Sequence, residues 1–173
     1  MQYLLIYASV NGQTKKIADR IAATILQQGH HLEMVSIADA PASLDSFDYV
    51  ILGSRIRFGS HDKAITDFVK KHNAWLDQHL SAFFSVSLVA RKTEKSLPET
   101  NRYCQKFLAK THWQPTQTAV FAGKLDYSLY NFWQKRIICL IMWMTNGPTD
   151  YSTKQEFTNW DAVDKFSNQL IQQ

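Results

Sequence analysis

Tyr-Leu-Leu-Ile-Tyr-Ala-Ser-Val-Asn-Gly-Gln-Thr, residues 3–14, is the stretch that decides the fold of this chain. Its first half is an apolar run typical of a buried strand, and its second half is a short polar loop. A helical pattern follows, because Ile17, Ile21 and Ile25 recur at a spacing of four residues. The N-terminus of a helix leaves backbone N–H groups unpaired and carries partial positive charge. A strand, a glycine-containing loop and a helix in this order therefore predict a phosphate-binding site.

The loop supplies both backbone and side-chain donors for one phosphate. Gly12 lets the backbone approach an anion closely. No Gly-Lys-Ser/Thr follows it, and the three glycines of a dinucleotide motif are missing, so neither a Walker loop nor a dinucleotide site is indicated. The residues predicted to bind the phosphate are Ser9, Val10, Asn11, Gly12, Gln13 and Thr14. An ordinary Asn-Gly turn ahead of a capped helix stays open as the alternative.

Outward from this loop, apolar strand patterns alternate with helical ones. Near-continuous apolar strands separated by helices are typical of a parallel sheet covered on both faces. We therefore expect a single domain over residues 1–173 with a doubly wound α/β fold and the strand order 2-1-3-4-5. The expected strands are residues 3–8, 32–36, 49–52, 82–88 and 119–123. Expected helix starts are Ser60 or Asp62 for the second helix, Pro98 inside the third, and Thr158 as the cap of the last.

In such folds, ligands bind outside the carboxyl ends of the strands, at the switch point between strands 1 and 3. Loop 53–61 falls there, and Ile56 and Phe58 are predicted to form the apolar wall of a flat ring system. Gly59 allows close backbone approach, while Arg55 and Arg57 are expected to face a carboxylate or an anionic reduced ring. Loop 85–95 borders the other side, with ring contacts predicted for Ser85, Val86, Ser87, Leu88, Val89, Ala90 and Arg91, and positive charge added by Lys92.

Composition restricts the kind of partner. The net charge is +4, and residues 51–150 hold 14 basic but only 7 acidic side chains. An anionic partner is therefore expected: a carboxylated substrate, a phosphate or a membrane surface. No nucleic-acid-binding motif, metal-ligand spacing or acid–base constellation is present in the sequence, which favours a redox cofactor that carries its own chemistry. No signal peptide is expected, because a strand pattern begins one residue after Met1.

One segment breaks the alternation of strands and helices. Between the fifth strand and the last helix lies an insert, predicted as Leu125–Asp150, and residues 137–144 within it are wholly apolar. At helical spacing, one apolar side is expected to hold Tyr130, Trp133, Ile137, Leu140, Ile141 and Met144. Lys135 and Arg136 are adjacent and could meet carboxylates or anionic lipid. A core helix stays open as the alternative to an interfacial or substrate-covering helix.

The residues also carry a family resemblance over essentially the whole chain. Ser/Thr-x-x-Gly-x-Thr in the first loop resembles the FMN-phosphate loop of flavodoxin-like proteins. The run from Ala82 to Lys92, in particular Leu-Val-Ala-Arg-Lys at 88–92, resembles the menaquinone-dependent protoporphyrinogen IX dehydrogenase family, a flavodoxin-like protoporphyrinogen oxidase family. The Ile56–Gly59 turn and the long insert agree with it. The start Ser9-Val10-Asn11 and the extra aromatic Trp143 depart mildly from the family pattern.

The resemblance implies FMN as the cofactor and oxidation of protoporphyrinogen IX to protoporphyrin IX in heme biosynthesis. It further implies menaquinone or ubiquinone as the electron acceptor, and a peripheral position on the cytoplasmic face of the bacterial inner membrane. The flavin would carry the chemistry, and Arg57, Arg91, Lys92, Lys135 and Arg136 are the candidates for substrate binding. A flavodoxin-type electron carrier, an FMN-dependent quinone reductase and a membrane-associated binding module stay open as alternatives, as does a homo-oligomer.

Overall fold

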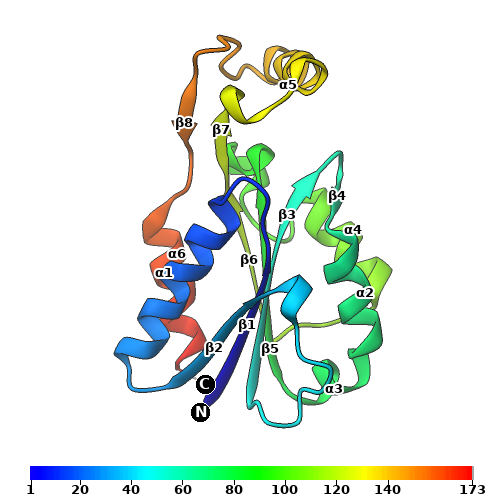
Figure 1. The fold of residues 1–173 in the computed structure, drawn as a ribbon, viewed down its shortest axis with the longest axis vertical. Helices are drawn as coiled ribbons and strands as arrows, with labels where there is room; N and C mark the ends of the chain where they lie inside the picture. The colour runs from blue at the N-terminus through cyan, green and yellow to red at the C-terminus, as the bar shows by residue number, and fades with distance from the viewer. Residues whose placement is uncertain (173) are drawn as a thin grey trace.

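Five parallel strands form the central sheet in the order β2-β1-β3-β5-β6, in a computed structural model that describes residues 1–172 (Figure 1). The predicted order 2-1-3-4-5 is confirmed, since β5 and β6 are the fourth and fifth parallel strands. A short β4 that the sequence did not predict pairs antiparallel with β3. The strands are β1 (Gln2–Ala8), β2 (His31–Ser36), β3 (Tyr49–Arg57), β4 (Ser60–His61), β5 (Leu80–Ser87) and β6 (Gln117–Ala122).

Helices cover both faces of this sheet, as its apolar strands predict (Figure 1). Successive strand residues point to opposite faces. Leu4 and Ile6 accordingly pack with the helices of one face, and Tyr3 and Leu5 pack with those of the other. One face is covered by α1 (Gln13–Gln27) and α6 (Trp160–Leu170), the other by α2 (Lys63–Lys71), α3 (Asn73–Gln78) and α4 (Arg102–Thr111).

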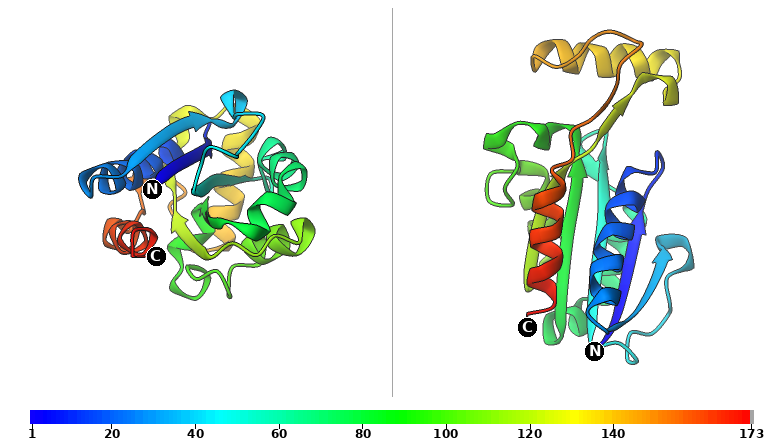
Figure 2. Two further views of the ribbon diagram at one scale, coloured as in Figure 1. Left: turned by 90° about the horizontal axis from the view of Figure 1, so that it is seen from below. Right: turned by 90° about the vertical axis from the view of Figure 1, so that its left-hand side faces the viewer.

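The insert forms a separate small layer above the carboxyl ends of the strands (Figures 1 and 2). It leaves through β7 (Lys124–Asp126), continues into α5 (Phe132–Met144) and returns through β8 (Lys154–Glu156), which pairs antiparallel with β7. It is therefore longer than the predicted Leu125–Asp150. Its own apolar cluster is built on Leu125, Tyr127 and Met142, with Leu88 packed against it. Short 3-10 turns are found at Ile37–Asp39, Leu88–Arg91, Thr93–Lys95 and Tyr127–Leu129.

The helix caps correct several predicted boundaries. Asp62, and not Ser60, caps α2 by accepting a hydrogen bond from the backbone N–H of Ala64. Pro98 lies in the turn before α4, whose cap is Asn101. Asn159, one residue after the predicted Thr158, caps α6. In each case a side-chain oxygen that reaches a free backbone N–H determines where the helix begins.

Candidate functional site

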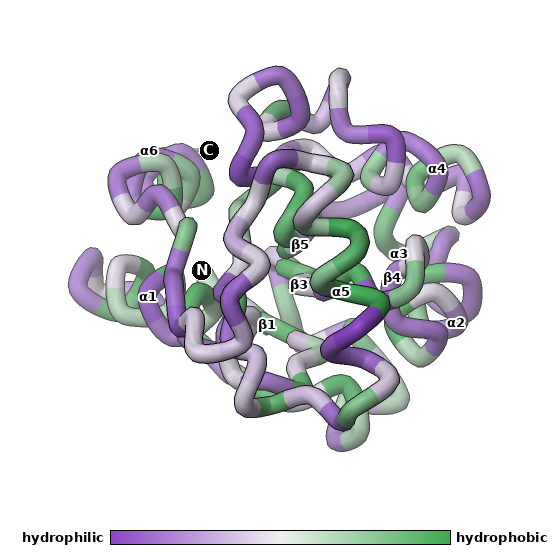
Figure 3. The backbone as a smooth tube through the Cα atoms, turned by 90° about the horizontal axis from the view of Figure 1, so that it is seen from above, coloured by the Kyte–Doolittle hydropathy of each residue, from purple (hydrophilic) through white to green (hydrophobic). Residues whose placement is uncertain are grey.

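The predicted site loops come together where β1, β3 and β5 end, beneath α5. Figure 3, a view from above, shows the largely apolar α5 running across this end of the molecule. The first loop connects β1 to α1, the second turns from β3 into β4, and the third follows β5 as a 3-10 turn. Gly53 to Arg57 belong to β3, and Val86 and Ser87 to β5, so both of these loops are shorter than predicted. The position agrees with the switch-point rule for open α/β sheets.

The first loop keeps the N-terminus of α1 free for an anion. Gly12 occupies the cap position with φ 81°, a left-handed conformation that glycine adopts without strain, and no side chain caps the helix. A Cβ added to Gly12 would meet no atom within 4 Å, so the backbone there faces open space. The first turn of α1 holds no acidic residue that would oppose an anion. The backbone N–H groups of this helix N-terminus are therefore accessible to an anion, as the predicted phosphate loop requires.

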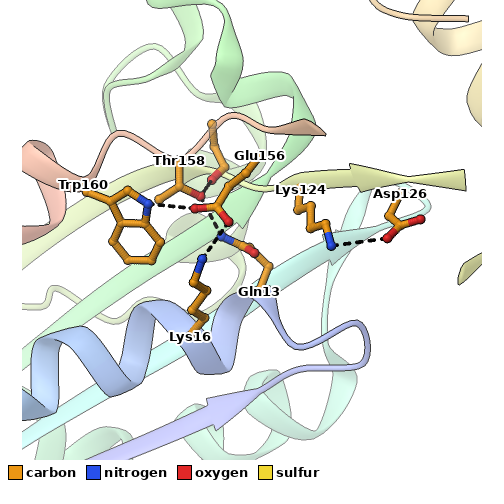
Figure 4. A network of polar contacts seen from close by, with 8 residues as sticks. Gln13, Lys16, Lys124, Asp126, Glu156, Thr158 and Trp160 are labelled. Carbon is orange, nitrogen blue, oxygen red and sulfur yellow. Dashed lines mark hydrogen bonds and ion pairs between the residues drawn. The ribbon is translucent and has the colours of Figure 1, made fainter. Parts of the chain in front are cut away.

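Gln13 and Thr14 lie in the first turn of α1 and are buried. The side chain of Gln13, however, points toward the returning end of the insert: its Nε2 donates to Thr158 Oγ1 at 2.9 Å, and that hydroxyl donates to the Ala122 carbonyl at 2.7 Å (Figure 4). Nearby, Lys16 Nζ lies 2.8 Å from Glu156 Oε2 (Figure 4). A phosphate contact of Gln13 would therefore come from its backbone rather than from its side-chain amide.

Three buried polar atoms at this edge of the sheet have no hydrogen-bond partner among residues 1–172. They are Ser9 Oγ after β1, Arg55 Nε near the end of β3, and Ser87 Oγ at the end of β5. Because buried polar groups are normally hydrogen-bonded, such atoms indicate partners that the chain itself does not supply. These three atoms and the uncapped N-terminus of α1 fit a ligand that has a phosphate group and a ring system with hydrogen-bonding groups along its edge. FMN has both.

The turn after β3 offers an exposed aromatic side chain. Ile56 and Arg57 end the strand, and Phe58 and Gly59 form the turn into β4. Phe58 is 72% exposed and adopts a left-handed φ of 47°, uncommon for an aromatic residue. The Arg57 guanidinium lies 5.1 Å from the centre of the Phe58 ring. The predicted ring wall and its cation are thus adjacent, and both are reachable from solvent.

His61 in β4 is a site neighbour that the sequence did not reveal. Its Nε2 lies 2.8 Å from Ser85 Oγ, and its ring packs against Phe83 and Phe107. Burial lowers the pKa of His61 to about 3, so the ring is neutral near pH 7. Ser85, predicted to contact the ring of a cofactor, is fully buried and bonded to this histidine. The two residues meet because β4 and β5 both pair with β3, which explains why sequence spacing gave no signal.

The predicted substrate cations occupy different settings. Arg57 and Arg136 are exposed and Lys92 and Lys135 half-buried, and the Arg136 guanidinium lies 4.8 Å from the Phe132 ring centre. Arg91 is engaged within the chain: its Nη2 donates to Thr145 O at 3.1 Å and Thr145 Oγ1 at 2.7 Å, and its Nη1 donates to Leu88 O at 3.0 Å. Burial lowers the pKa of Arg91. For Arg91, the contacts favour a structural role over the predicted contact with substrate.

Tyr130 reaches from the insert toward the first loop. Burial raises its pKa, while the Asn11 side chain and the cations Arg57 and Arg55 act in the opposite direction. The residue precedes α5 and does not belong to the helical stripe in which it was predicted. Its hydrogen bond with the Asn11 side chain links the insert to the phosphate loop, and this contact depends on the folded insert rather than on any pattern in the sequence.

The predicted apolar side of α5 is exposed. Trp133 and Met144 are 73% and 70% exposed, and Ile137, Leu140 and Ile141 are exposed as well. On the opposite side of α5, Ile138, Cys139 and the buried Met142 pack in the apolar cluster of the insert with Leu125 and Tyr127. At 100° per residue, exposed side chains cover about half of the helix circumference. The core-helix alternative is therefore wrong, because α5 covers neither face of the sheet.

Comparisons with known proteins agree with this architecture. The flavodoxin-domain family matches residues 4–152. A protoporphyrinogen IX dehydrogenase (quinone) from Escherichia coli K12 is 37% identical over 172 residues, covering 98% of this chain and 94% of the relative. A protein of the same name from Leishmania major is 38% identical, covering 95% of this chain and 72% of its own. Flavodoxin 2 from Bacillus cereus shares the fold with a TM-score of 0.57 at 19% identity, covering 99% of this chain and 96% of that one.

Fold and site together define a flavodoxin-like flavoprotein. The chain belongs to the flavodoxin-domain family and, within it, to the group of the protoporphyrinogen IX dehydrogenases (quinone).

Proposed function

We propose that this protein uses FMN to oxidise protoporphyrinogen IX to protoporphyrin IX, a step of heme biosynthesis, and passes the electrons to a quinone. Near-full-length similarity to two relatives of that name supports the reaction class. The observation that carries the proposal is the insert: α5 exposes a wide apolar surface and lies over the loops of the candidate cofactor site. A large macrocycle and a lipid-soluble acceptor both require apolar surface near the redox centre.

Each part of the site then has a task. FMN, when bound, would accept two electrons as a hydride from the substrate and would be reoxidised by the quinone. The N-terminus of α1 holds the phosphate, with Ser9 Oγ and the backbone at Gly12 as donors. Phe58 and the end of β5 border the ring. Arg57 attracts the propionates of the tetrapyrrole, because it is exposed and close to the Phe58 wall.

A flavodoxin-type electron carrier is the second candidate, and the fold alone would suit it. Such carriers dock on basic partners through acidic surfaces, whereas this chain has a net charge of +4. A carrier also needs no apolar helix above its cofactor. Charge and insert together favour the dehydrogenase.

We further propose that the protein works as a peripheral protein on the cytoplasmic face of the bacterial inner membrane, where quinone resides. None of the helices within residues 1–172 has the length and apolarity to cross a bilayer. An apolar helix surface with Trp133 and Trp143 exposed and Lys135 and Arg136 adjacent suits the headgroup boundary of anionic lipid.

Turnover decides between the two candidates. The purified FMN-loaded protein is mixed anaerobically with protoporphyrinogen IX, and the flavin absorbance is followed before and after a quinone is added. We expect bleaching by porphyrinogen, recovery with quinone, and porphyrin fluorescence that appears as three two-electron flavin cycles complete each six-electron oxidation. A flavin that stays oxidised with fresh porphyrinogen, yet is reduced by dithionite, would refute the dehydrogenase and leave the carrier.

The cofactor assignment has its own test in Gly12→Val. A branched side chain at φ 81° is strained, and it would fill the space through which the phosphate approaches. We expect FMN affinity to fall by about 100-fold, the scale of losing a few charge-assisted hydrogen bonds. Gly29→Val is the matched control, because Gly29 has φ 79° and open space but lies at the far end of α1. Equal FMN affinity in the two variants would remove the phosphate loop from the proposal.

A further inference from the structure

The two ends of α5 are held in different ways. Its N-terminal end is locally self-sufficient, because Asn131 and Gln134 form a reciprocal capping box. Its C-terminal end depends on a residue far away in sequence: Arg91 donates two hydrogen bonds to Thr145, the residue that ends the helix. Within residues 1–172, these are the only hydrogen bonds that connect residues 131–149 to the α/β layer.

Arg91 is suited to this contact by its shape. One guanidinium nitrogen binds the carbonyl and the hydroxyl of Thr145, and the other binds Leu88 O in the turn from which Arg91 itself projects. The Thr145 hydroxyl in turn donates to Ile141 O at 2.7 Å, so it is fixed in the accepting orientation. A positive charge at the C-terminal end of a helix is also favoured by the helix dipole. A lysine could supply the charge but not the planar fork.

The chain leaves room for this contact at Gly147. A Cβ there would lie 2.8 Å from Arg91 Nη2 and 2.5 Å from Met142 Sδ, which is too close for either atom to stay in place. Met142 is the buried side chain of α5, and Leu88 from the same turn as Arg91 packs against its cluster. Leu88–Arg91 therefore supplies an apolar and a polar contact at the C-terminal end of α5.

The same turn was identified above as one border of the cofactor site. We infer that Arg91 is a positioning residue that fastens α5 over the cofactor loops and thereby sets how porphyrinogen and quinone reach the flavin. The inference rests on the proposed function, since it assigns α5 a place in that reaction. It gives Arg91 a task different from binding a substrate carboxylate: the guanidinium acts through the helix that it holds.

The experiment compares Arg91→Met, Arg91→Lys and Gly147→Ala with the wild-type protein, each loaded with FMN. Lys110→Met is the matched control, since it removes one exposed positive charge on α4, away from the insert. Hydrogen exchange of residues 137–149 reports the fastening directly. Steady-state kinetics with porphyrinogen and quinone measure how the fastening affects turnover. Reduction of the flavin by dithionite measures flavin reactivity that does not depend on the position of α5.

For Arg91→Met and Gly147→Ala we expect exchange in residues 137–149 to accelerate by roughly tenfold or more, while β1 and β5 keep their protection. The value of kcat/KM for porphyrinogen should fall about tenfold, mainly through KM, because a misplaced helix loosens substrate positioning. FMN content and dithionite reduction should match those of Lys110→Met. Arg91→Lys should lie between wild type and Arg91→Met in both readouts.

Two results would overturn the inference. Unchanged exchange in Arg91→Met would show that Arg91 does not fasten α5. Faster exchange with wild-type kinetics would show that the fastening has no bearing on the reaction. If the wild-type protein holds FMN but does not oxidise porphyrinogen, the proposed function fails instead, and the exchange comparison alone still decides whether Arg91 holds the helix.

Discussion

The α/β layer and the insert treat apolar residues in opposite ways. In the layer, the isoleucine, valine and phenylalanine side chains of β1, β3 and β5, apart from Ile56 at the end of β3, are almost completely buried between two sets of helices. In the insert, α5 buries only Met142, while tryptophan, isoleucine and leucine side chains face outward. Exposed apolar surface of that extent on a globular domain marks an interaction site more often than a folding element. The buried side chains of the layer hold the fold together, whereas the exposed apolar side of α5 is free for interaction.

The strongest test of this difference between the two regions is to remove one large aromatic side chain from each of them and to compare the loss of stability. Phe83 is fully buried in β5 and stacks on Phe107, so Phe83→Ala should lower the free energy of unfolding by about 3–5 kcal/mol. Trp133→Ser removes a larger but exposed side chain and should change it by less than about 0.5 kcal/mol. Urea unfolding of both variants measures the difference. Equal destabilisation would mean that α5 belongs to the folding core.

Removal of the helix itself is the next test. Replacement of residues 128–147 by a short Gly/Ser linker should leave a folded, FMN-binding domain, because β7 and β8 still pair and both faces of the sheet stay covered. Porphyrinogen–quinone activity should fall by about 100-fold or more, as expected when binding energy and positioning are lost together. Binding to anionic liposomes should fall in parallel. An insoluble or unfolded product would favour a core role, and full activity would exclude a functional one.

The two regions should also differ in their response to acid. His61 lies in the layer, and residues 124–156 contain no histidine. Burial lowers the pKa of His61 to about 3 from its ordinary value of 6.5, so between these pH values the histidine binds a proton in the unfolded chain but not in the folded protein. Stability should therefore decrease as the pH falls from about 6.5 toward 3, by at most about 1.4 kcal/mol per pH unit from this group.

In His61→Gln, which keeps a hydrogen-bonding side chain beside Ser85, that part of the pH slope should disappear. Thermal unfolding at pH 7.5 and pH 5 measures it, with His31→Gln on the exposed start of β2 as the control. An identical slope in wild type and His61→Gln would show that the ring is not held neutral in the folded protein.

The smallest effects on binding and turnover are expected when exposed arginines are replaced. These replacements test whether the layer or the insert binds the anionic groups of the substrate and of the lipid. Arg57→Ala in the layer should raise the KM for porphyrinogen by up to about tenfold at low salt and less at high salt, because exposed charges chiefly guide encounter. Arg136→Ala in the insert should weaken liposome binding and leave that KM nearly unchanged. If Arg136→Ala instead raised the KM and Arg57→Ala instead weakened liposome binding, the propionates would bind the insert and the lipid would contact the layer.

Much of the layer could be predicted because its signals are local. Apolar runs fix the five parallel strands, and a glycine loop after the first strand fixes the place of the site. Helix starts were harder to predict, because Asn101 caps α4 through two side-chain hydrogen bonds and Asn159 caps α6 through one, and the sequence pattern does not show these bonds. His61, the β7–β8 pairing and the Arg91 contact depend on residues brought together only by the folded chain, and Arg91 and Thr145 are separated by 54 positions. Spacing in the sequence carries no trace of such partners.

The short ladder between β7 and β8 has a consequence for how such a protein can change over evolution. Lys124 is paired with Glu156, and Phe157 N donates to Gly123 O at 3.0 Å, so the excursion starts and ends at one point of the α/β layer. Because both ends of the insert meet at one point, it affects the rest of the domain as one tight turn would. The length of the insert therefore adds little to the entropy cost of loop closure. A lineage could exchange this helix for another, longer, shorter or more polar, without disturbing the strands below. The β7–β8 ladder is thus an insertion site, and exchange of the insert there could give one flavin-binding domain a new substrate or a new location in the cell.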